Sequence, residues 1–389
     1  MPKKSFYLVF AVVALGVVSA MHYYLWLRLV AQPLWSPAVG ALLTGALIAL
    51  AAAIPLTFIG ERLVAPPLGR ALVWPGAVWM GLAWLLFAQL VLSDLALGLP
   101  GLLADPATAR VRALVVVGLG ALGVALGLRG ALRLPRVKFV TLELDRWPAA
   151  LDGYRIAQIS DLHIGPMLAA KWLGRVVRRV NAVAADCVVV TGDLVDGPAR
   201  HFAVELAPLA ELRARHGIYC VTGNHELYSG PADWLPAFER VGVTVLGNAR
   251  RTLEHNGASF DLAGTHDRQG ALAGIPEDLG RALDGRDPAR PVVLLAHTPT
   301  TFPAAAARGV DLTLSGHTHG GQIWPFNYLV KLAMRYVAGL YRRGDSQLYV
   351  SRGTGFWGPP MRLGAPSEIT AITLRATGAL GASRDTTDG

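Results

Sequence analysis

The middle of the chain contains the run CVVVTGD (residues 187–193), in which an apolar, β-rich segment is followed directly by a glycine and an aspartate. β-Branched residues favour extended strands, and glycine permits the sharp turn that ends one. The run RIAQISDLH (residues 155–163) has the same order, with mainly apolar residues first and polar residues at its end. Each run therefore predicts a buried strand whose carboxyl end presents an acidic side chain.

The pattern recurs three times toward the C-terminus, and helix-like stretches at residues 169–184 and 202–214 separate the first three runs. Alternation of strands and helices predicts an α/β fold, in which ligands collect beyond the carboxyl ends of the strands. We therefore expect the polar residues at these ends to meet in space. The three later ends are Gly223-Asn224-His225-Glu226, His297 and Gly316-His317-Thr318-His319.

Asp, Asn and His side chains at five successive strand ends favour a metal centre. Two divalent cations held about 3.5–4 Å apart need a carboxylate that bridges them, with nitrogen and oxygen ligands on either side. A single histidine after a strand is more often structural, but five such ends together favour the metal centre. The candidate metal ligands are Asp161, His163, Asp193, Asn224, His297, His317 and His319.

These motifs, in this order, resemble the calcineurin-like metallophosphoesterase superfamily over roughly residues 150–375. The longer forms at residues 316–322 and 351–355 resemble its bacterial transmembrane branch. The resemblance implies an αββα sandwich of two mixed sheets and two divalent metal ions (Mn, Fe or Zn). It also implies the ligands: Asp161, His163, Asp193 and His319 for one ion, and Asp193, Asn224, His297 and His317 for the other, with Asp193 as the bridge.

The same resemblance implies roles for two further residues. His225 would donate a proton to the leaving group, and Asp196 would orient His225, while a hydroxide that bridges the two metals attacks phosphorus in line. Protein phosphatases of the superfamily carry arginine directly after the position of Asp196, where this chain has Gly197. Because that arginine clamps phosphate with two hydrogen bonds, its loss makes a phosphoprotein substrate less expected.

The first 136 residues have a different composition from the rest. They hold ten Lys/Arg and three Asp/Glu, whereas the remaining residues hold 26 and 24. Their apolar runs predict four transmembrane spans, at residues 5–27, 34–60, 71–93 and 111–132, because about 20 apolar residues cross a bilayer. The fourth run is short and spans only if Arg112 and Arg129 extend to the interfaces.

The apolar runs have two alternative interpretations. Core helices of a soluble protein would show polar faces, which these runs lack. A cleavable signal peptide that ends at Val18-Ser19-Ala20 is an alternative for the first run. We expect a transmembrane helical domain at residues 1–136, a catalytic domain at residues 137–376 and a disordered tail at residues 377–389.

The positive charges predict the orientation. With the N-terminus in the cytoplasm, cytoplasmic segments hold eight Lys/Arg and the opposite side holds three, so the catalytic domain is expected in the cytoplasm, on the inner (plasma) membrane of the cell. If the fourth run did not cross the membrane, the catalytic domain would lie on the opposite side. Cys187 and Cys220 lie in apolar runs and are expected to be buried thiols, which fits a reducing compartment.

The sequence therefore predicts a membrane-anchored phosphoesterase whose substrate is a lipid-linked or nucleotide-linked phosphate ester. Its partners are the lipid bilayer and the phosphate ester. Nucleic acid is not expected, because the polar part lacks a Lys/Arg cluster, and no protein partner is predicted. Some membrane-bound relatives suggest a narrower alternative, a pyrophosphatase that cleaves UDP-diacylglucosamine in lipid A synthesis.

Alternatives of other classes are a non-catalytic membrane sensor or scaffold, which would not need His225 and Asp196, and a transporter. Transport paths usually carry several ionisable residues, whereas Asp94 is almost alone in the spans. Residues 328–343 mix apolar and basic side chains. This segment predicts either a surface helix or an amphipathic flap that contacts the bilayer or a lipid substrate.

Overall fold

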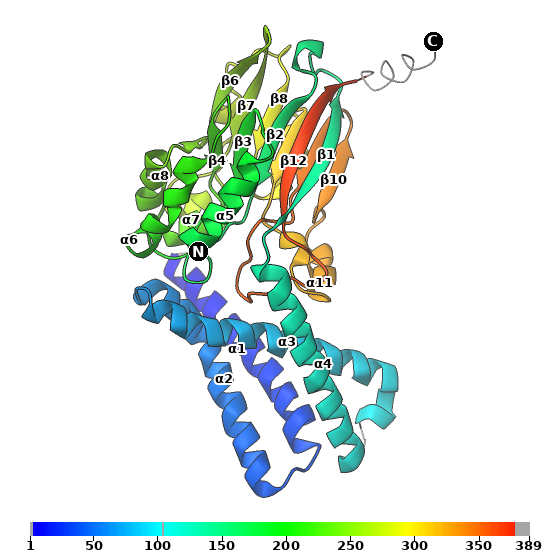
Figure 1. Cartoon of the computed structure of the whole chain (residues 1–389). Helices are drawn as coiled ribbons and strands as arrows, with labels where there is room; N and C mark the ends of the chain where they lie inside the picture. Colours follow the sequence, from blue (N-terminus) through cyan, green and yellow to red (C-terminus); the bar gives the residue numbers. More distant parts are fainter. Residues whose placement is uncertain (1–2, 103–104, 378–389) are drawn as a thin grey trace. The chain divides into compact units, whose positions relative to one another are not determined.

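The computed structural model describes residues 3–102 and 105–377, and the chain divides into two compact units (Figure 1). The first unit comprises residues 1–132 and 358–363, and the second comprises residues 133–357 and 364–389. The expected disordered tail lies outside the described residues from position 378 onward.

The first unit is a bundle of apolar helices. Leu42 is 72% exposed and Leu95 is 76% exposed, as expected for side chains that face lipid rather than water. All four helices are long and apolar enough to cross a membrane, over residues 11–31, 37–63, 68–98 and 106–132. The helices are α1 (Lys3–Trp26), continued by the π-helical turn Leu27–Ala31, α2 (Pro37–Leu63), α3 (Leu68–Leu102) and α4 (Pro106–Leu132).

Charged side chains meet inside this bundle. Asp94 of α3 accepts hydrogen bonds from the Tyr24 hydroxyl (2.5 Å) and from Arg112 (2.5 Å), and it pairs with Arg28 at 2.8 Å. Arg112 was expected to extend toward the interface, but in the structure the Asp94 carboxylate compensates its charge within the bundle. Helix α4 begins at Pro106, before Arg112, and is longer than the expected span.

Replacing Asp94 by asparagine should destabilise the bundle, because Arg28 and Arg112 would then be buried without their shared carboxylate. Breaking a buried ion pair by removing one partner costs about 3–5 kcal/mol. Thermal unfolding of the full-length protein in detergent micelles would measure the loss. The control is Asp345→Asn, which removes the same charge from an exposed turn. Equal melting temperatures for both variants would show that the cluster does not stabilise the bundle.

A short excursion late in the chain also belongs to the helical unit. The Arg362 N–H donates to the Gly127 carbonyl at 2.9 Å, and Met361 packs beside Gly81 and Gly127. Residues 358–363 thus pack against α3 and α4, although the residues before and after them belong to the second unit. No local pattern in the sequence predicts that these six residues belong to the helical unit.

The second unit is a mixed α/β sandwich, which confirms the predicted fold class. In the first sheet the strand order is β1-β12-β2-β3-β4-β5, and in the second it is β10-β11-β9-β8-β7-β6. The first sheet contains β1 (Arg136–Leu144), β2 (Tyr154–Ile159), β3 (Cys187–Thr191), β4 (Ile218–Val221), β5 (Thr244–Val245) and β12 (Glu368–Ala376). The second contains β6 (Ala249–His255), β7 (Ala258–Gly264), β8 (Val292–Leu295), β9 (Leu312–Ser315), β10 (Gly339–Arg343) and β11 (Ser346–Val350).

The core lies between the two sheets. Every residue of β3 is buried, and strands β2, β3 and β4 run parallel, as do β7, β8 and β9. Parallel strands are covered on both faces and therefore consist of continuous apolar runs. Cys187 and Cys220 are free and buried, as expected. Within each sheet, the strands that precede the candidate ligands therefore run in the same direction, and their carboxyl ends lie at one edge of that sheet.

Helices cover the sheets. In α5 (Ala170–Asn181) the buried side chains are Leu173, Val176, Val177 and Val180, the spacing of one helical face. The expected helix at residues 202–214 is instead mostly a 3₁₀-helix, Ala203–Glu211, which contains Pro208. The remaining helices are α6 (Ala199–Phe202), α7 (Asn224–Ser229), α8 (Pro231–Arg240), α9 (Leu279–Leu283), α10 (Phe302–Ala306) and α11 (Phe326–Ala333).

Candidate metal centre

The structure brings the seven candidate metal ligands together at the carboxyl ends of the strands. Six of the seven side chains are buried and that of His317 is half-buried. Their order along the fold is Asp161 and His163 after β2, Asp193 after β3, Asn224 at the start of α7, His297 after β8, and His317 and His319 after β9.

Asp161, His163 and His319 form the first group of possible ligands. The Nε2 atoms of His163 and His319 face each other at 3.1 Å, and His319 Nε2 lies 3.6 Å from Asp161 Oδ1. Asp161 Oδ2 is buried and has no hydrogen-bond partner. A buried carboxylate oxygen without a partner is costly unless a cation compensates it, so this group fits a metal ion.

Asp193, His297 and His317 form the second group. His297 Nδ1 donates to the Thr191 carbonyl at 2.8 Å, so its Nε2 atom is the one available for coordination. That atom lies 3.1 Å from Asp193 Oδ2 and 3.1 Å from Asn224 Oδ1. Burial lowers the pKa of His297, but the Asp193 charge raises it well above the usual value. The converging oxygens thus favour a positive charge at this point.

Asp193 lies between the two groups. Its Oδ2 atom is 3.1 Å from His297 Nε2 and 3.9 Å from His163 Nε2. Although burial opposes ionisation of Asp193, the neighbouring imidazoles hold the pKa of its carboxyl well below the usual value. An ionised carboxylate that faces both groups has the position that a bridging ligand requires.

The backbone at the ligands is strained. Five of the seven ligands are non-glycine residues in the left-handed conformation, which L-residues rarely adopt and which clusters at functional sites. Glycines allow close approach here: a Cβ atom on Gly223 would overlap Asp193 Oδ1, and one on Gly316 would overlap Ser160 and Asp161. The strained ligands are Asp161 (φ 54°), His163 (φ 48°), Asp193 (φ 53°), His317 (φ 73°) and His319 (φ 51°).

His225 and Asp196, the two candidate catalytic residues, are in contact. His225 Nδ1 lies 2.6 Å from Asp196 Oδ1. Burial lowers the pKa of His225, but the Asp193 and Asp196 charges outweigh it and raise the pKa to about 9. Asp196 is outside the candidate ligand set, so its charge stays available to His225. A raised pKa and a carboxylate partner at Nδ1 suit an imidazole that donates a proton from Nε2.

Two supporting contacts of the site were not predicted from the sequence. Asp196 Oδ1 also lies 3.0 Å from His163 Nδ1, so one carboxylate oxygen orients both imidazoles. The buried Glu226 carboxylate accepts hydrogen bonds from the N–H groups of Gly223 (2.6 Å), Asp193 (3.0 Å) and Leu194 (2.7 Å). Burial and the Asp193 charge raise the pKa of Glu226 to about 7. In the sequence, the signal for a role of Glu226 in the site is its position directly after His225 in the motif.

Aromatic side chains flank His225. Its ring centroid lies 5.3 Å from that of Trp357 and 5.7 Å from that of Tyr228, and both neighbours are about 40% exposed. The Gln322 side chain fixes Trp357, because it donates to the Trp357 carbonyl (2.8 Å) and accepts from the Trp357 N–H (3.1 Å). These rings form an apolar wall on the side of the site where His225 lies.

Comparisons with known proteins find metallophosphoesterase relatives. Residues 154–321 match the family model described as calcineurin-like phosphoesterase. A Bos taurus protein named "Transmembrane protein with metallophosphoesterase domain" is 38% identical over 64% of this chain and 59% of its own length. An uncharacterized metallophosphoesterase of Helicobacter pylori is 38% identical over 62% of this chain and 64% of its own.

An uncharacterized metallophosphoesterase of Aquifex aeolicus is 32% identical over 62% of this chain and 93% of its own length. The chain thus spans about three-fifths of the length of the bovine and Helicobacter relatives but nearly all of the Aquifex protein. The matched family segment includes every candidate ligand.

Proposed function

Because this chain belongs to the calcineurin-like metallophosphoesterase family, we propose that it uses two divalent metal ions to hydrolyse a lipid-linked phosphate ester. Family membership makes the protein a phosphoester hydrolase. Its four apolar helices and its transmembrane homologue make it a membrane-associated one.

In the proposed centre Asp193 is shared by both ions. The proposal is supported by the position of its Oδ2 atom, 3.1 Å from His297 Nε2 and 3.9 Å from His163 Nε2. A mixed set of imidazole and carboxylate ligands suits Mn, Fe or Zn better than Ca, which prefers oxygen. The proposed ligands are Asp161, His163, Asp193 and His319 for one ion, and Asp193, Asn224, His297 and His317 for the other.

When bound, the ions would neutralise the phosphoryl oxygens and lower the pKa of the water that attacks phosphorus. The proton for the leaving group comes from His225. Because His225 Nδ1 is held by Asp196 at 2.6 Å, Nε2 is the atom that presents a proton to the leaving-group oxygen. Trp357 and Tyr228 reduce the access of water to this side of the imidazole.

The pairing of His225 with Asp196 beside the ligands is the observation that carries the catalytic proposal. A sensor or scaffold that only bound a ligand at the centre would need the metal ligands. It would gain nothing from His225, an imidazole outside the ligand set that is held by the Asp196 carboxylate. A leaving-group acid, in contrast, needs this arrangement.

A lipid-linked substrate is supported by the attachment of the catalytic unit to the helices. Confinement near a bilayer raises the effective concentration toward membrane-resident substrates, whereas a soluble substrate gains nothing from it. The excess of Lys/Arg in the segments on one side of the spans supports a cytoplasmic catalytic unit on the plasma membrane.

The substrate proposal is tested with full-length protein in nanodiscs, because residues 358–363 pack within the helical unit and would lose their contacts in a detached domain. Two nitrophenyl phosphodiesters are compared. In the lipid ester the second ester group is diacylglycerol, and in the soluble ester it is not. With the lipid ester in the same disc as the protein, we expect hydrolysis about 10²-fold or more faster than for the soluble ester at equal total concentration.

The control places the lipid ester in separate discs, which removes the confinement without changing the chemistry. The rate should then fall to that of the soluble ester or below it. Equal rates in shared and separate discs would contradict a lipid-linked substrate, while the hydrolase assignment would stand as long as either ester is cleaved.

A further inference from the structure

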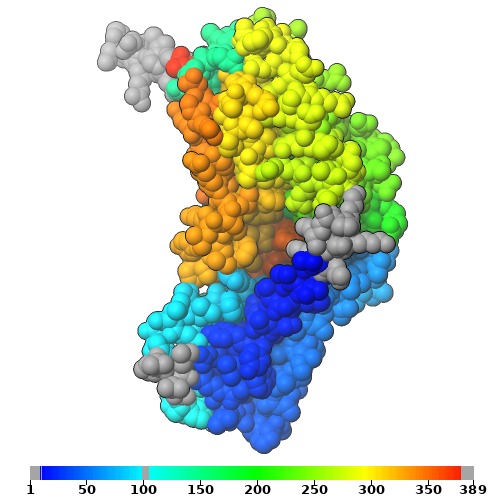
Figure 2. Space-filling view, turned by 180° about the vertical axis from the view of Figure 1, so that it is seen from behind, coloured from blue at the N-terminus to red at the C-terminus, as the bar shows by residue number. Residues whose placement is uncertain are grey.

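Helix α11 exposes apolar side chains to solvent. None of its residues is buried, and Leu332 is 85% exposed, Tyr328 55% and Leu329 47%. The space-filling view shows this part of the chain, in orange, on the surface of the second unit (Figure 2). Exposed leucine and tyrosine side chains on a surface helix without buried residues are typical of a helix that lies in a membrane interface.

Helix α11, the loop after it and strand β10 carry basic side chains. Residues 324–343 contain no Asp or Glu. Among the described residues, no acidic side chain forms a salt bridge with any of the four cations of this segment. These cations are Lys331, Arg335, Arg342 and Arg343.

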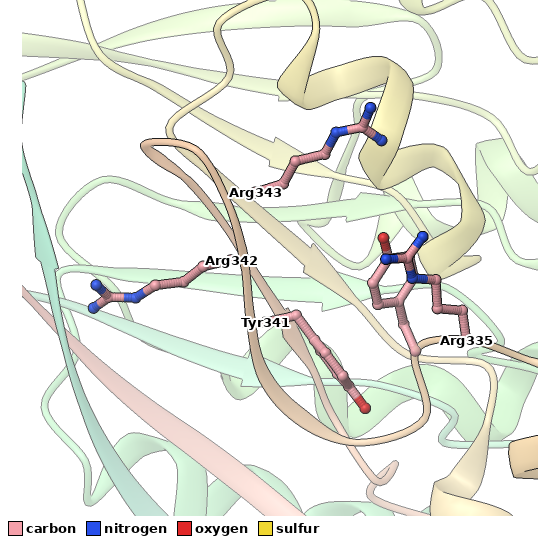
Figure 3. Close-up of a pocket in the computed structure, with 5 residues that line it drawn as sticks. Arg335, Tyr341, Arg342 and Arg343 are labelled. Carbon is pink, nitrogen blue, oxygen red and sulfur yellow. The ribbon is translucent and has the colours of Figure 1, made fainter.

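Three of the four cations line a cavity of about 420 Å³, together with Tyr336 and Tyr341. Figure 3 shows Arg342 and Arg343 on opposite sides of the hairpin, with Arg335 on the Arg343 side. The Tyr336 and Tyr341 rings meet at 5.1 Å, and the Arg335 guanidinium lies 5.6 Å from the centre of the Tyr336 ring. On the side of Arg335 and Arg343, planar guanidinium groups, which bind phosphate oxygens well, thus lie beside the aromatic rings.

This surface is joined to the metal-ligand loop. The Thr318 hydroxyl, between His317 and His319, donates to the Val337 carbonyl, and the Val337 N–H donates to the Tyr341 hydroxyl at 3.0 Å. Gly321 (φ 81°) lies so close to Asn327 of α11 that a Cβ atom would overlap its backbone. The position of α11 and the cavity is therefore fixed to the loop that carries two candidate ligands.

We propose that α11 and β10, with the loop between them, form a docking surface for anionic phospholipid headgroups of the bilayer. Arg335, Arg342 and Arg343 bind headgroup phosphates, and Leu329 and Leu332 enter the boundary of the acyl region. Candidate spans in the same chain keep a bilayer within reach, and the excess of cations matches an anionic leaflet. The surface goes beyond the proposed function, because it binds bulk lipid and does not depend on hydrolysis.

The test uses full-length Leu332→Cys protein labelled with an environment-sensitive fluorophore. The two native cysteines are free but buried, so labelling at position 332 is selective. In nanodiscs that contain phosphatidylglycerol we expect a blue-shifted emission that high salt reverses, because salt screens surface charge. Discs of phosphatidylcholine alone, with or without inorganic phosphate, should give no shift.

Charge reversal at the hairpin, Arg342→Glu with Arg343→Glu, should lower the ratio of docked to undocked surface about 30-fold or more, since each lost cation removes about 1 kcal/mol of attraction. The matched control, Arg240→Glu with Arg251→Glu, reverses two exposed charges elsewhere on the unit and should leave the shift unchanged. Arg335→Gln, outside any strand, provides a milder variant with a smaller expected loss.

Normal metal content and gel-filtration behaviour would show that the variants are folded. A shift of equal size in phosphatidylcholine discs would overturn the proposal, because headgroup charge would then be irrelevant. So would an unchanged shift in the folded double variant and in Arg335→Gln, or a shift produced by inorganic phosphate alone.

Discussion

Replacing Asp193 by asparagine is expected to reduce hydrolysis of every phosphate ester by about 10³-fold or more. A bridging carboxylate is shared, so its loss weakens both proposed metal sites at once. Metal ions stabilise the transition state by several kcal/mol, and each 1.4 kcal/mol corresponds to about a tenfold change in rate. Steady-state assays of full-length wild-type and variant protein with nitrophenyl and alkyl esters would measure the loss.

Asp186→Asn is the matched control for this substitution. Asp186 precedes the same strand at its opposite end, where it accepts a hydrogen bond from the Arg155 N–H at 2.8 Å, a bond that an asparagine oxygen can replace. We expect the control to keep its activity. If Asp193→Asn hydrolysed esters as fast as Asp186→Asn does, Asp193 would not be the shared ligand.

His225→Ala should act selectively. Loss of a general acid lowers rates by about 10²–10⁴-fold when the leaving group needs a proton, as alkoxides do. Nitrophenolate leaves readily without protonation, so nitrophenyl esters should lose much less. The measurement is kcat for a series of esters of increasing leaving-group pKa, on wild type and variant with equal metal content.

The control for His225→Ala is His201→Ala, in α6 and away from the ligands, which should leave the series unchanged. An equal loss for nitrophenyl and alkyl esters, with the metals retained, would exclude the proton-donor role. The dependence on leaving group separates this role from a purely structural one, because a distorted site would slow all esters alike.

The ligand positions could be predicted because each depends on a local pattern. An apolar run predicts a buried strand, and the polar residue at its end must lie at the edge of the sheet. Asp193 after β3 and His297 after β8 illustrate this, because neither position requires knowledge of which strands are neighbours. The α/β class followed from the same alternation and is confirmed by the two mixed sheets.

Contacts between distant parts of the chain had no such local signal. Trp357 follows His225 by more than a hundred residues, and only the loop held by Gln322 brings its ring to 5.3 Å. Asp196 was expected to orient His225 alone, because a sequence does not show that the same oxygen also lies 3.0 Å from His163. The shared carboxylate became visible only with side-chain positions.

The helical unit shows the same limit. Span lengths followed from the apolar runs, but the partners of charged residues did not. The apolar run predicts that Arg112 extends to the interface, whereas Asp94 of another helix pairs with it at 2.5 Å. The excursion at residues 358–363 is too short to show a helical or strand period, so its membership of the helical unit could not be read from sequence.

Metal titration of the full-length protein tests the central claim most directly. Protein stripped of metal is supplied with increasing Mn²⁺ while bound ions per chain and hydrolysis of a nitrophenyl ester are measured on the same samples. The account predicts that two ions bind per chain and that activity appears as the second one binds. Full activity with one ion per chain, or binding of two ions without hydrolysis of any phosphate ester, would contradict it.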